Sequence, residues 1–99
     1  MQVDKNNLVS ATLAQLSRSD GGAAVLLQPF KKDRALCVIR CHDGYHVLER
    51  GFARQDFNVD EKKIRKLLKK LCRKEFPRSH KVWLTRCTEA EIRERYGAG

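Results

Sequence analysis

The sequence is poor in several residues and patterns that mark particular classes of protein. Only two prolines and six glycines occur among 99 residues, which excludes collagen-like and low-complexity chains. No apolar run approaches the roughly 18 residues that a membrane-spanning helix needs, so we expect no such helix. Residues 1–16 lack a basic stretch followed by an apolar one, and we therefore expect no secretory signal.

Cysteine is scarce and loosely spaced, at Cys37, Cys41, Cys72 and Cys87. Without a secretory signal, such a set predicts reduced thiols in a cytoplasmic protein rather than a disulfide framework. Cys37 and Cys41 on one strand would lie about 13 Å apart, which is too far to share a metal ion. Cys41 and His46 are predicted cross-strand neighbours, but their spacing matches no recognisable zinc site. We therefore expect no metal and no cofactor.

Signs of catalysis are also missing. No glycine-rich phosphate-binding loop follows a predicted strand, and no pair of carboxylates stands out from the surface charge. Aromatic residues make up only 7% of the chain. They do not form the interleaved Phe/Tyr pattern with which sheet-surface RNA-binding proteins stack single-stranded bases. We therefore expect neither an enzyme nor a binder of bases on a sheet surface.

Positive charge, by contrast, is abundant and concentrated. The net charge is +9. Residues 60–81 contain ten Lys and Arg against three Asp and Glu, a net charge of +7, whereas residues 1–30 and 82–99 are each neutral. A dispersed excess would mainly concern solubility, but a concentrated one creates a local positive field that attracts anions.

Local patterns predict a single domain over residues 1–99, which is a typical domain length. The predicted elements are a helix at 6–18, strands at 23–30, 34–42 and 45–52, a helix at 60–76, a strand at 80–86 and a helix at 88–96. Residues 53–58 are predicted to be a connector. A turn at 17–22 is predicted to end the first helix, and Gly97 is predicted to end the last. This order, α-β-β-β-α-β-α, predicts an α+β fold with a mostly antiparallel sheet, a meander of three strands plus a fourth, packed by helices.

The strongest strand signal is a hairpin. Asp43-Gly44 between two apolar runs predicts a two-residue type I′ turn, because that turn needs positive φ at both central positions. The resulting register pairs Cys41 with His46 and Ile39 with Leu48. One face is expected to be drier and to meet the helices; it carries Ala35, Cys37, Ile39, Cys41, His46, Leu48 and Phe52.

The predicted helix at 60–76 has an apolar side and a basic side. Asp60 is its expected N-cap, and Pro77 prevents it from continuing. At about 100° per residue, one apolar sector is expected to be core, formed by Ile64, Leu67, Leu68, Leu71 and Cys72. The opposite side carries a straight basic row, which consists of Lys62, Lys66, Lys69 and Arg73.

The basic row is unfavourable for the helix by itself. Exposed helix faces usually mix Glu with Lys, because such i,i+4 pairs are stabilising. Here Lys62/Lys66 and Lys69/Arg73 are like-charged pairs, and each costs about 0.2 to 0.5 kcal/mol. Bound phosphates, or the carboxylates of an acidic partner, would relieve this repulsion, and an ordinary solvated face is the remaining alternative.

These observations predict a small non-enzymatic domain that binds nucleic acid, with RNA favoured over DNA. The basic row would contact phosphates, and the residues expected to extend its field are Lys70, Lys74, Arg78 and Lys81. The alternative is an adaptor or small subunit that docks an acidic protein through the same helix. A membrane is not an expected partner, because the apolar sector lacks Trp and Phe anchors before Phe76.

Two further features are expected to be structurally ordinary. Lys31, Lys32 and Arg34 form a second basic cluster, which is predicted to be a solvated loop. Trp83 alternates with apolar neighbours on a predicted strand, so we expect it to pack in the core or against a helix.

In the order of its first five elements, over about residues 6–76, the chain resembles the double-stranded RNA-binding domain. In that family a lysine cluster at the start of the second helix contacts phosphates, and Lys62, Lys63 and Lys66 hold comparable positions here. Asp60 and Glu61 stand where the family has a Ser/Ala-rich helix entry, and its Gly-Pro loop is absent. The resemblance is one of architecture, and it implies phosphate contacts from the first turns of the helix.

Overall fold

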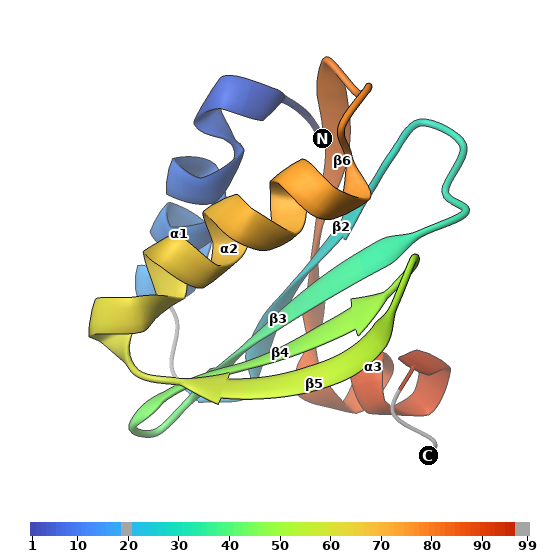
Figure 1. The fold of residues 1–99 in the computed structure, drawn as a ribbon. Helices are drawn as coiled ribbons and strands as arrows, with labels where there is room; N and C mark the ends of the chain where they lie inside the picture. The colour runs from blue at the N-terminus through green and yellow to red at the C-terminus, as the bar shows by residue number, and fades with distance from the viewer. Residues whose placement is uncertain (19–20, 97–99) are drawn as a thin grey trace.

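In the part of the chain that the structure describes, six antiparallel strands form one sheet, with α-helices α1 and α2 on one face and α3 on the other (Figure 1). The computed structural model describes residues 1–18 and 21–96. Its elements are β1 (Gln2–Asp4), the 3-10 helix η1 (Lys5–Asn7), α1 (Leu8–Ser17), β2 (Ala23–Gln28), β3 (Ala35–Cys41), β4 (Gly44–Arg50), β5 (Arg54–Val59), α2 (Glu61–Glu75), β6 (Lys81–Thr88) and α3 (Glu89–Tyr96). The expected turn around 19–20 and the helix stop at Gly97 lie outside the described residues.

The predicted fold class is confirmed: the chain is a single α+β domain with an antiparallel sheet. The strand order is β1-β6-β2-β3-β4-β5. Two strands were not expected from the sequence. β1 pairs with β6 at one edge, and β5 occupies the stretch predicted as a connector and pairs with β4 at the other edge. Four strands rather than three therefore separate α1 from α2, so the element order that carried the resemblance to the double-stranded RNA-binding domain is not present.

The β3–β4 hairpin is displaced by two residues from its predicted register. Cys41 pairs with Gly44 and Ile39 pairs with His46, so the loop consists of His42 and Asp43. No residue of this loop has a positive φ, and the predicted type I′ turn at Asp43-Gly44 is therefore wrong. A shift of two residues keeps every side chain on its own face, so the predicted division into two faces is correct.

The predicted assignment of helices to one face is only partly correct, because both faces meet helices. The face expected to be more polar packs against α1 and α2; its buried residues include Leu36, Val38, Tyr45 and Val47. The cysteine-bearing face, with Cys37, Ile39 and Leu48, forms a smaller cluster with Ile92 of α3. Both faces of the central strands are therefore dry, as expected for strands covered by helices on each side.

α2 forms as the sequence predicts. The Asp60 carboxylate accepts a hydrogen bond from the Lys63 backbone N–H at 3.0 Å, which caps the first turn. The helix ends at Glu75, before Pro77. The apolar sector faces the sheet: Ile64, Leu68, Leu71 and Cys72 are buried and Leu67 is half-buried.

Side-chain caps open η1 and α3 but not α1. Asp4 caps η1 by accepting from the Asn6 N–H at 2.9 Å, and α1 then starts at Leu8 without a cap from the Asn7 side chain. Thr88 Oγ1 accepts from the Glu91 N–H at 3.2 Å and caps the first turn of α3. No helix in the described part of the chain has the length and apolarity needed to cross a membrane.

Candidate nucleic-acid interface

The basic row of α2 lies on the side of the helix away from the sheet. Lys62, Lys66, Lys69 and Arg73 are all exposed, while the apolar sector behind them is held in the core. Burial of that sector fixes which way the four cations point, because the helix cannot rotate without exposing apolar surface. The predicted geometry of the row is therefore present in the structure.

A shallow surface depression of about 510 Å³ follows this side of α2, and every residue that lines it is cationic: Lys66, Lys69, Lys70, Arg73 and Lys74. Five positive groups thus surround one small volume of solvent. Their fields add there, so the depression is a favourable position for an anion. Lys70, expected only to extend the field, is one of its walls.

Lys74 differs from its neighbours because it has an internal partner. Its Nζ lies 3.0 Å from Oε2 of Glu49, whose side chain has 0% exposure. A buried carboxylate needs such a counter-charge, since an unpaired charge in the interior is strongly destabilising. Lys74 therefore contributes less net positive field than expected, and its first role is to neutralise Glu49.

The first turn of α2 carries acid instead of a phosphate-binding entry. Asp60 serves as the cap, and Glu61 Oε1 lies 3.1 Å from Arg40 Nη2 of β3. These two carboxylates oppose the binding of phosphate at the helix start. The start of α2, where the family resemblance implies phosphate contacts for Lys62 and Lys63, is therefore the part of the helix least favourable for binding phosphate. The strongest cationic surface lies nearer its C-terminal end.

A larger hollow, which we call the end groove, begins where α2 ends. It has a volume of about 820 Å³. Three connections that are distant in sequence form its walls: the β2–β3 loop, the β4–β5 turn and the segment between α2 and β6. It is lined by Gln2, Pro29, Phe30, Lys31, Asp33, Arg34, Phe52, Glu75, Pro77, Arg78, Ser79, His80 and Lys81.

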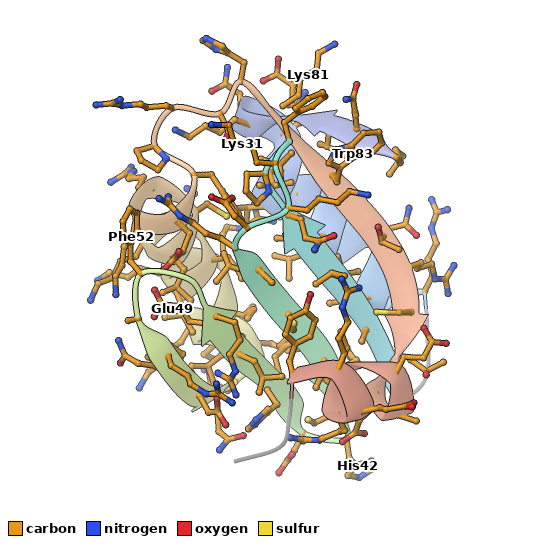
Figure 2. All side chains as sticks on the ribbon, turned by 90° about the vertical axis from the view of Figure 1, so that its right-hand side faces the viewer. Lys31, His42, Glu49, Phe52, Lys81 and Trp83 are labelled. Carbon is orange, nitrogen blue, oxygen red and sulfur yellow. The ribbon has the colours of Figure 1, made fainter. Side chains whose placement is uncertain are left out.

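The end groove brings together basic residues that the sequence placed in two separate clusters. Arg78 and Lys81, expected to extend the α2 patch, line it beside Lys31 and Arg34 of the loop predicted to be merely solvated. Figure 2 shows Lys31 and Lys81 near each other at one end of the molecule, with His42 of the hairpin loop at the opposite end. The cationic surface at this end is therefore built from both clusters.

Two phenylalanines stand exposed at the end groove. Phe30 is 75% exposed and Phe52 is 63% exposed. The prediction that Phe52 lies on a dry face is wrong, because β4 ends at Arg50 and Phe52 sits in the turn that follows. Trp83 is only half-buried and lies on the sheet face opposite α1 and α2, with Lys32 Nζ 5.4 Å from its ring centroid. Phe30 and Phe52 thus lie in loops that line the end groove, which a strand-by-strand pattern does not detect.

Buried carboxylates hold Phe52 in place. Its backbone N–H donates to both oxygens of Glu75, at 3.0 and 3.2 Å. Burial and a hydrogen bond with Glu49 raise the pKa of Glu75 above its ordinary value. The Arg34 guanidinium stacks on the Phe52 ring, 3.6 Å from its centroid, and donates to the Glu75 carbonyl at 3.0 Å. The turn, the loop and the end of α2 are therefore tied together beneath the exposed ring.

The cysteines are placed for packing. Cys41 does not face His46 as predicted, and the His46 Nδ1 instead lies 2.6 Å from Asn58 Oδ1. Burial raises the pKa of Cys37 and of Cys72 to about 12, so both thiols stay protonated near neutral pH. Within residues 1–18 and 21–96, no three His, Cys, Asp or Glu side chains come together in a way that would hold a metal ion.

The described residues therefore present a cationic depression along α2 and, beyond it, the end groove, which also contains aromatic rings. Comparisons of this chain with protein-family models, with curated proteins and with solved structures find no match. Function is accordingly inferred from the residues themselves.

Proposed function

We propose that this protein is a small non-enzymatic domain that binds nucleic acid through the basic row of α2. The observation that carries the proposal is the depression whose five lining residues are all cations. Phosphate oxygens spaced along a strand are suitable partners for such a row, which has a length of about 16 Å at 1.5 Å per residue. Contacts of this kind supply affinity without sequence preference.

The energetic argument is the repulsion along the helix. Lys66 and Lys70, like Lys62 and Lys66, are exposed like-charged neighbours at i,i+4. In the free protein these pairs reduce the stability of α2, and neutralisation by bound phosphates removes that cost. Asp60 and Glu61 confine the favourable region to the middle and C-terminal part of the row, from Lys66 to Arg73.

An adaptor that docks an acidic protein is the second candidate, and the exposed Phe30 and Phe52 are the observation in its favour. Aromatic anchors beside charged groups are common at the centres of protein interfaces. This candidate predicts that one acidic protein is captured from an extract and stays bound after nuclease treatment. A cytoplasmic location remains a prediction from the four cysteines in either case.

Fluorescence anisotropy with duplex RNA, duplex DNA and single strands, titrated across salt, tests the proposal. Binding should weaken so that log K falls by about 0.9 per log unit of salt for each phosphate neutralised on a B-form duplex, or about 0.7 on a single strand. The double variant Lys66→Glu/Lys69→Glu should bind much more weakly and with a shallower slope.

The matched control reverses a charge on the far side of the sheet. Arg95 is exposed on α3, and Arg95→Glu changes the net charge by the same amount as either single reversal on α2. If Arg95→Glu weakens binding as much as Lys69→Glu, only the total charge matters and the basic row is not the site. Absence of binding by all probes at low salt would also refute the proposal.

A further inference from the structure

The end groove differs from the depression on α2 because it combines cations with flat apolar surfaces. Four basic side chains, those of Lys31, Arg34, Arg78 and Lys81, line it together with the two exposed phenylalanine rings. A volume of about 820 Å³ is within the range of ligand-binding clefts, which is roughly 300 to 1,000 Å³. Two large aromatic side chains exposed in one cleft are informative, because grouped exposed apolar surface commonly marks an interaction site.

The ring of Phe52 is held in a defined position. Its own N–H is fixed by the buried Glu75 carboxyl, and Arg34 covers part of the ring while being anchored to the Glu75 carbonyl. A ring that is already ordered loses little conformational freedom when a flat ligand stacks on it. Phe52 is therefore an ordered, exposed ring on which a flat ligand can stack.

The loop that carries Phe30 is also constrained. Lys32 has a φ of 56°, in the left-handed region that lysine rarely adopts, and its N–H donates to the Pro29 carbonyl at 2.9 Å. This conformation brings Lys32 above Trp83 and leaves Phe30 pointing away from the core. Backbone strain of this kind persists only where the surroundings enforce it, and it is frequent at ligand sites.

The opposite wall is fastened by the N-terminal segment. Lys5 donates through its backbone N–H to the His80 carbonyl at 2.9 Å and through Nζ to the Pro77 carbonyl at 3.3 Å. These two bonds hold the segment that presents Arg78 between α2 and β6. The cations and the rings thus approach the end groove from separate, anchored connections.

Unpaired nucleotides match this combination. Each nucleotide carries a base that stacks on an aromatic ring and a phosphate that pairs with Lys or Arg, which is how single-stranded segments are generally bound. A paired duplex hides the faces of its bases, so it can use the cations but not Phe30 or Phe52. An acidic peptide likewise satisfies the cations but needs apolar side chains of its own to cover both rings, whereas every unpaired nucleotide carries a base that can stack.

We propose that the end groove binds unpaired nucleotides by stacking bases on Phe30 and Phe52, with Lys31, Arg34, Arg78 and Lys81 holding the phosphates. This inference rests on the proposed function, since it assigns the single-stranded part of a nucleic acid to the end groove and the phosphate backbone of the adjoining duplex to α2. The domain then prefers a duplex with a single-stranded overhang to a blunt duplex of the same length.

Three fluorescent RNA probes test this inference: a blunt duplex, the same duplex with an overhang of several nucleotides, and the overhang sequence alone. The wild-type protein should bind the overhang duplex more tightly than the blunt one at equal salt. Phe52→Ala and Phe30→Ala should each weaken binding of the two single-stranded probes by about five- to 150-fold, the usual range for loss of one stacked base. Binding of the blunt duplex should change by less than about twofold.

Two controls separate stacking from general damage. Both rings are largely exposed, so the alanine variants should keep the thermal unfolding curve of the wild type. Phe52→Leu and Phe52→Tyr form a matched pair: leucine keeps apolar bulk without a flat ring and should bind as weakly as alanine, whereas tyrosine should restore binding. Equal binding by the leucine and wild-type proteins would overturn the inference.

Failure of this inference is distinguishable from failure of the proposed function. If Lys66→Glu/Lys69→Glu weakens all three probes while the phenylalanine variants bind normally, α2 is the site and the end groove is not. If the phenylalanine variants alone weaken single-strand binding, the end groove stands and the proposed role of α2 falls. Displacement of the overhang probe by poly-glutamate at equal charge concentration would show that only negative charge is recognised, which would also overturn the inference.

Discussion

The Lys74 ammonium lies 3.0 Å from Oε2 of Glu49, a carboxylate with no exposed surface. This contact joins the basic side of α2 to β4 in the interior of the sheet. It also places a fixed negative charge beneath one end of a surface that is otherwise cationic. The pair therefore ties the stability of the fold to the same helix that is proposed to hold phosphates.

Replacing Lys74 with methionine should destabilise the protein, because Glu49 would remain buried without its counter-charge. Breaking a buried ion pair costs about 3 to 5 kcal/mol. The Lys74 side chain is 39% exposed, so screening by water reduces this value, and we expect a loss of about 1 to 3 kcal/mol. Unfolding in urea, followed by circular dichroism, measures the change.

Lys70→Met is the matched control, since Lys70 is exposed on the same helix and forms no ion pair with an acid in the described part of the chain. Its effect on the free energy of unfolding should stay within about 0.5 kcal/mol. Glu49→Gln combined with Lys74→Met should recover much of the lost stability, because neither charge then remains. Equal stability of the two single lysine variants would show that the ion pair contributes nothing.

The raised pKa of Glu75 predicts a dependence of stability on pH. Burial and the hydrogen bond with Glu49 make the folded protein retain this proton above the ordinary carboxyl pKa of 4.5. The stabilisation from the proton is complete below about 4.5 and is lost as pH rises through the folded-state pKa. Relative to the wild type, Glu75→Gln should therefore become progressively more stable as pH increases across that interval.

The measurement is the free energy of unfolding in urea at a series of pH values, taken as the difference between variant and wild type. Glu94 is exposed on α3, so Glu94→Gln is the matched control for loss of one carboxylate outside the core. If the difference for Glu75→Gln followed the same course with pH as the difference for Glu94→Gln, burial would not set the protonation of Glu75.

Local signals explain which elements the sequence predicts well. α2 has a cap at Asp60, helical spacing of its apolar residues and a proline beyond its end, all within one continuous stretch. β5 was missed because only Phe57 and Val59 face the core, while Asp56 and Asn58 point to the other face. Asp and Asn are uncommon in strands, and this strand forms through its pairing with β4 rather than through its own composition.

Of the two candidate surfaces, local sequence signals predict one and miss the other. The basic row was predictable because it lies on one helix, whose apolar sector determines its direction. The end groove was not predictable, because β6 lies between β1 and β2 in the sheet and so brings Lys81 toward Lys31. A local sequence pattern does not indicate which distant strands pair. The partner of Lys74 was hidden for the same reason, since Glu49 lies on a strand 25 positions earlier in the chain.

Asp60 allows the capping and electrostatic roles of one carboxylate to be separated. Asn caps helices about as well as Asp, so Asp60→Asn should leave the free energy of unfolding nearly unchanged, whereas Asp60→Ala should cost about 0.5 to 2 kcal/mol. Both variants remove a negative charge next to the basic row. Both should bind an RNA duplex about twofold more tightly at low salt, consistent with the small energies of exposed charges.

Anisotropy titrations at low and high salt provide the readout, with urea unfolding in parallel. The gain in affinity should disappear at high salt, because it comes from a screened interaction between exposed charges. Unchanged or weaker binding by Asp60→Asn at low salt would mean that the Asp60 charge does not oppose the bound phosphates, and a gain that persisted at high salt would mean that it does not come from screened charges.

Gly44 provides a test of the corrected hairpin. Its φ is not positive, so glycine is not needed there for its backbone conformation. Glycine is needed because the Val59 backbone carbonyl and the Asp60 Cα approach the position that a side chain would occupy. Backbone atoms cannot move aside as a flexible side chain does, so Gly44→Ala should destabilise the protein by about 1 to 3 kcal/mol. Gly21→Ala is the matched control, because no atom lies within 4 Å of its added methyl group and its φ is not positive. That variant should be neutral or slightly stabilising in the same urea experiment, by up to about 1 kcal/mol. Equal effects of the two substitutions would mean that strand β5 does not pack against the β3–β4 hairpin as closely as the register requires.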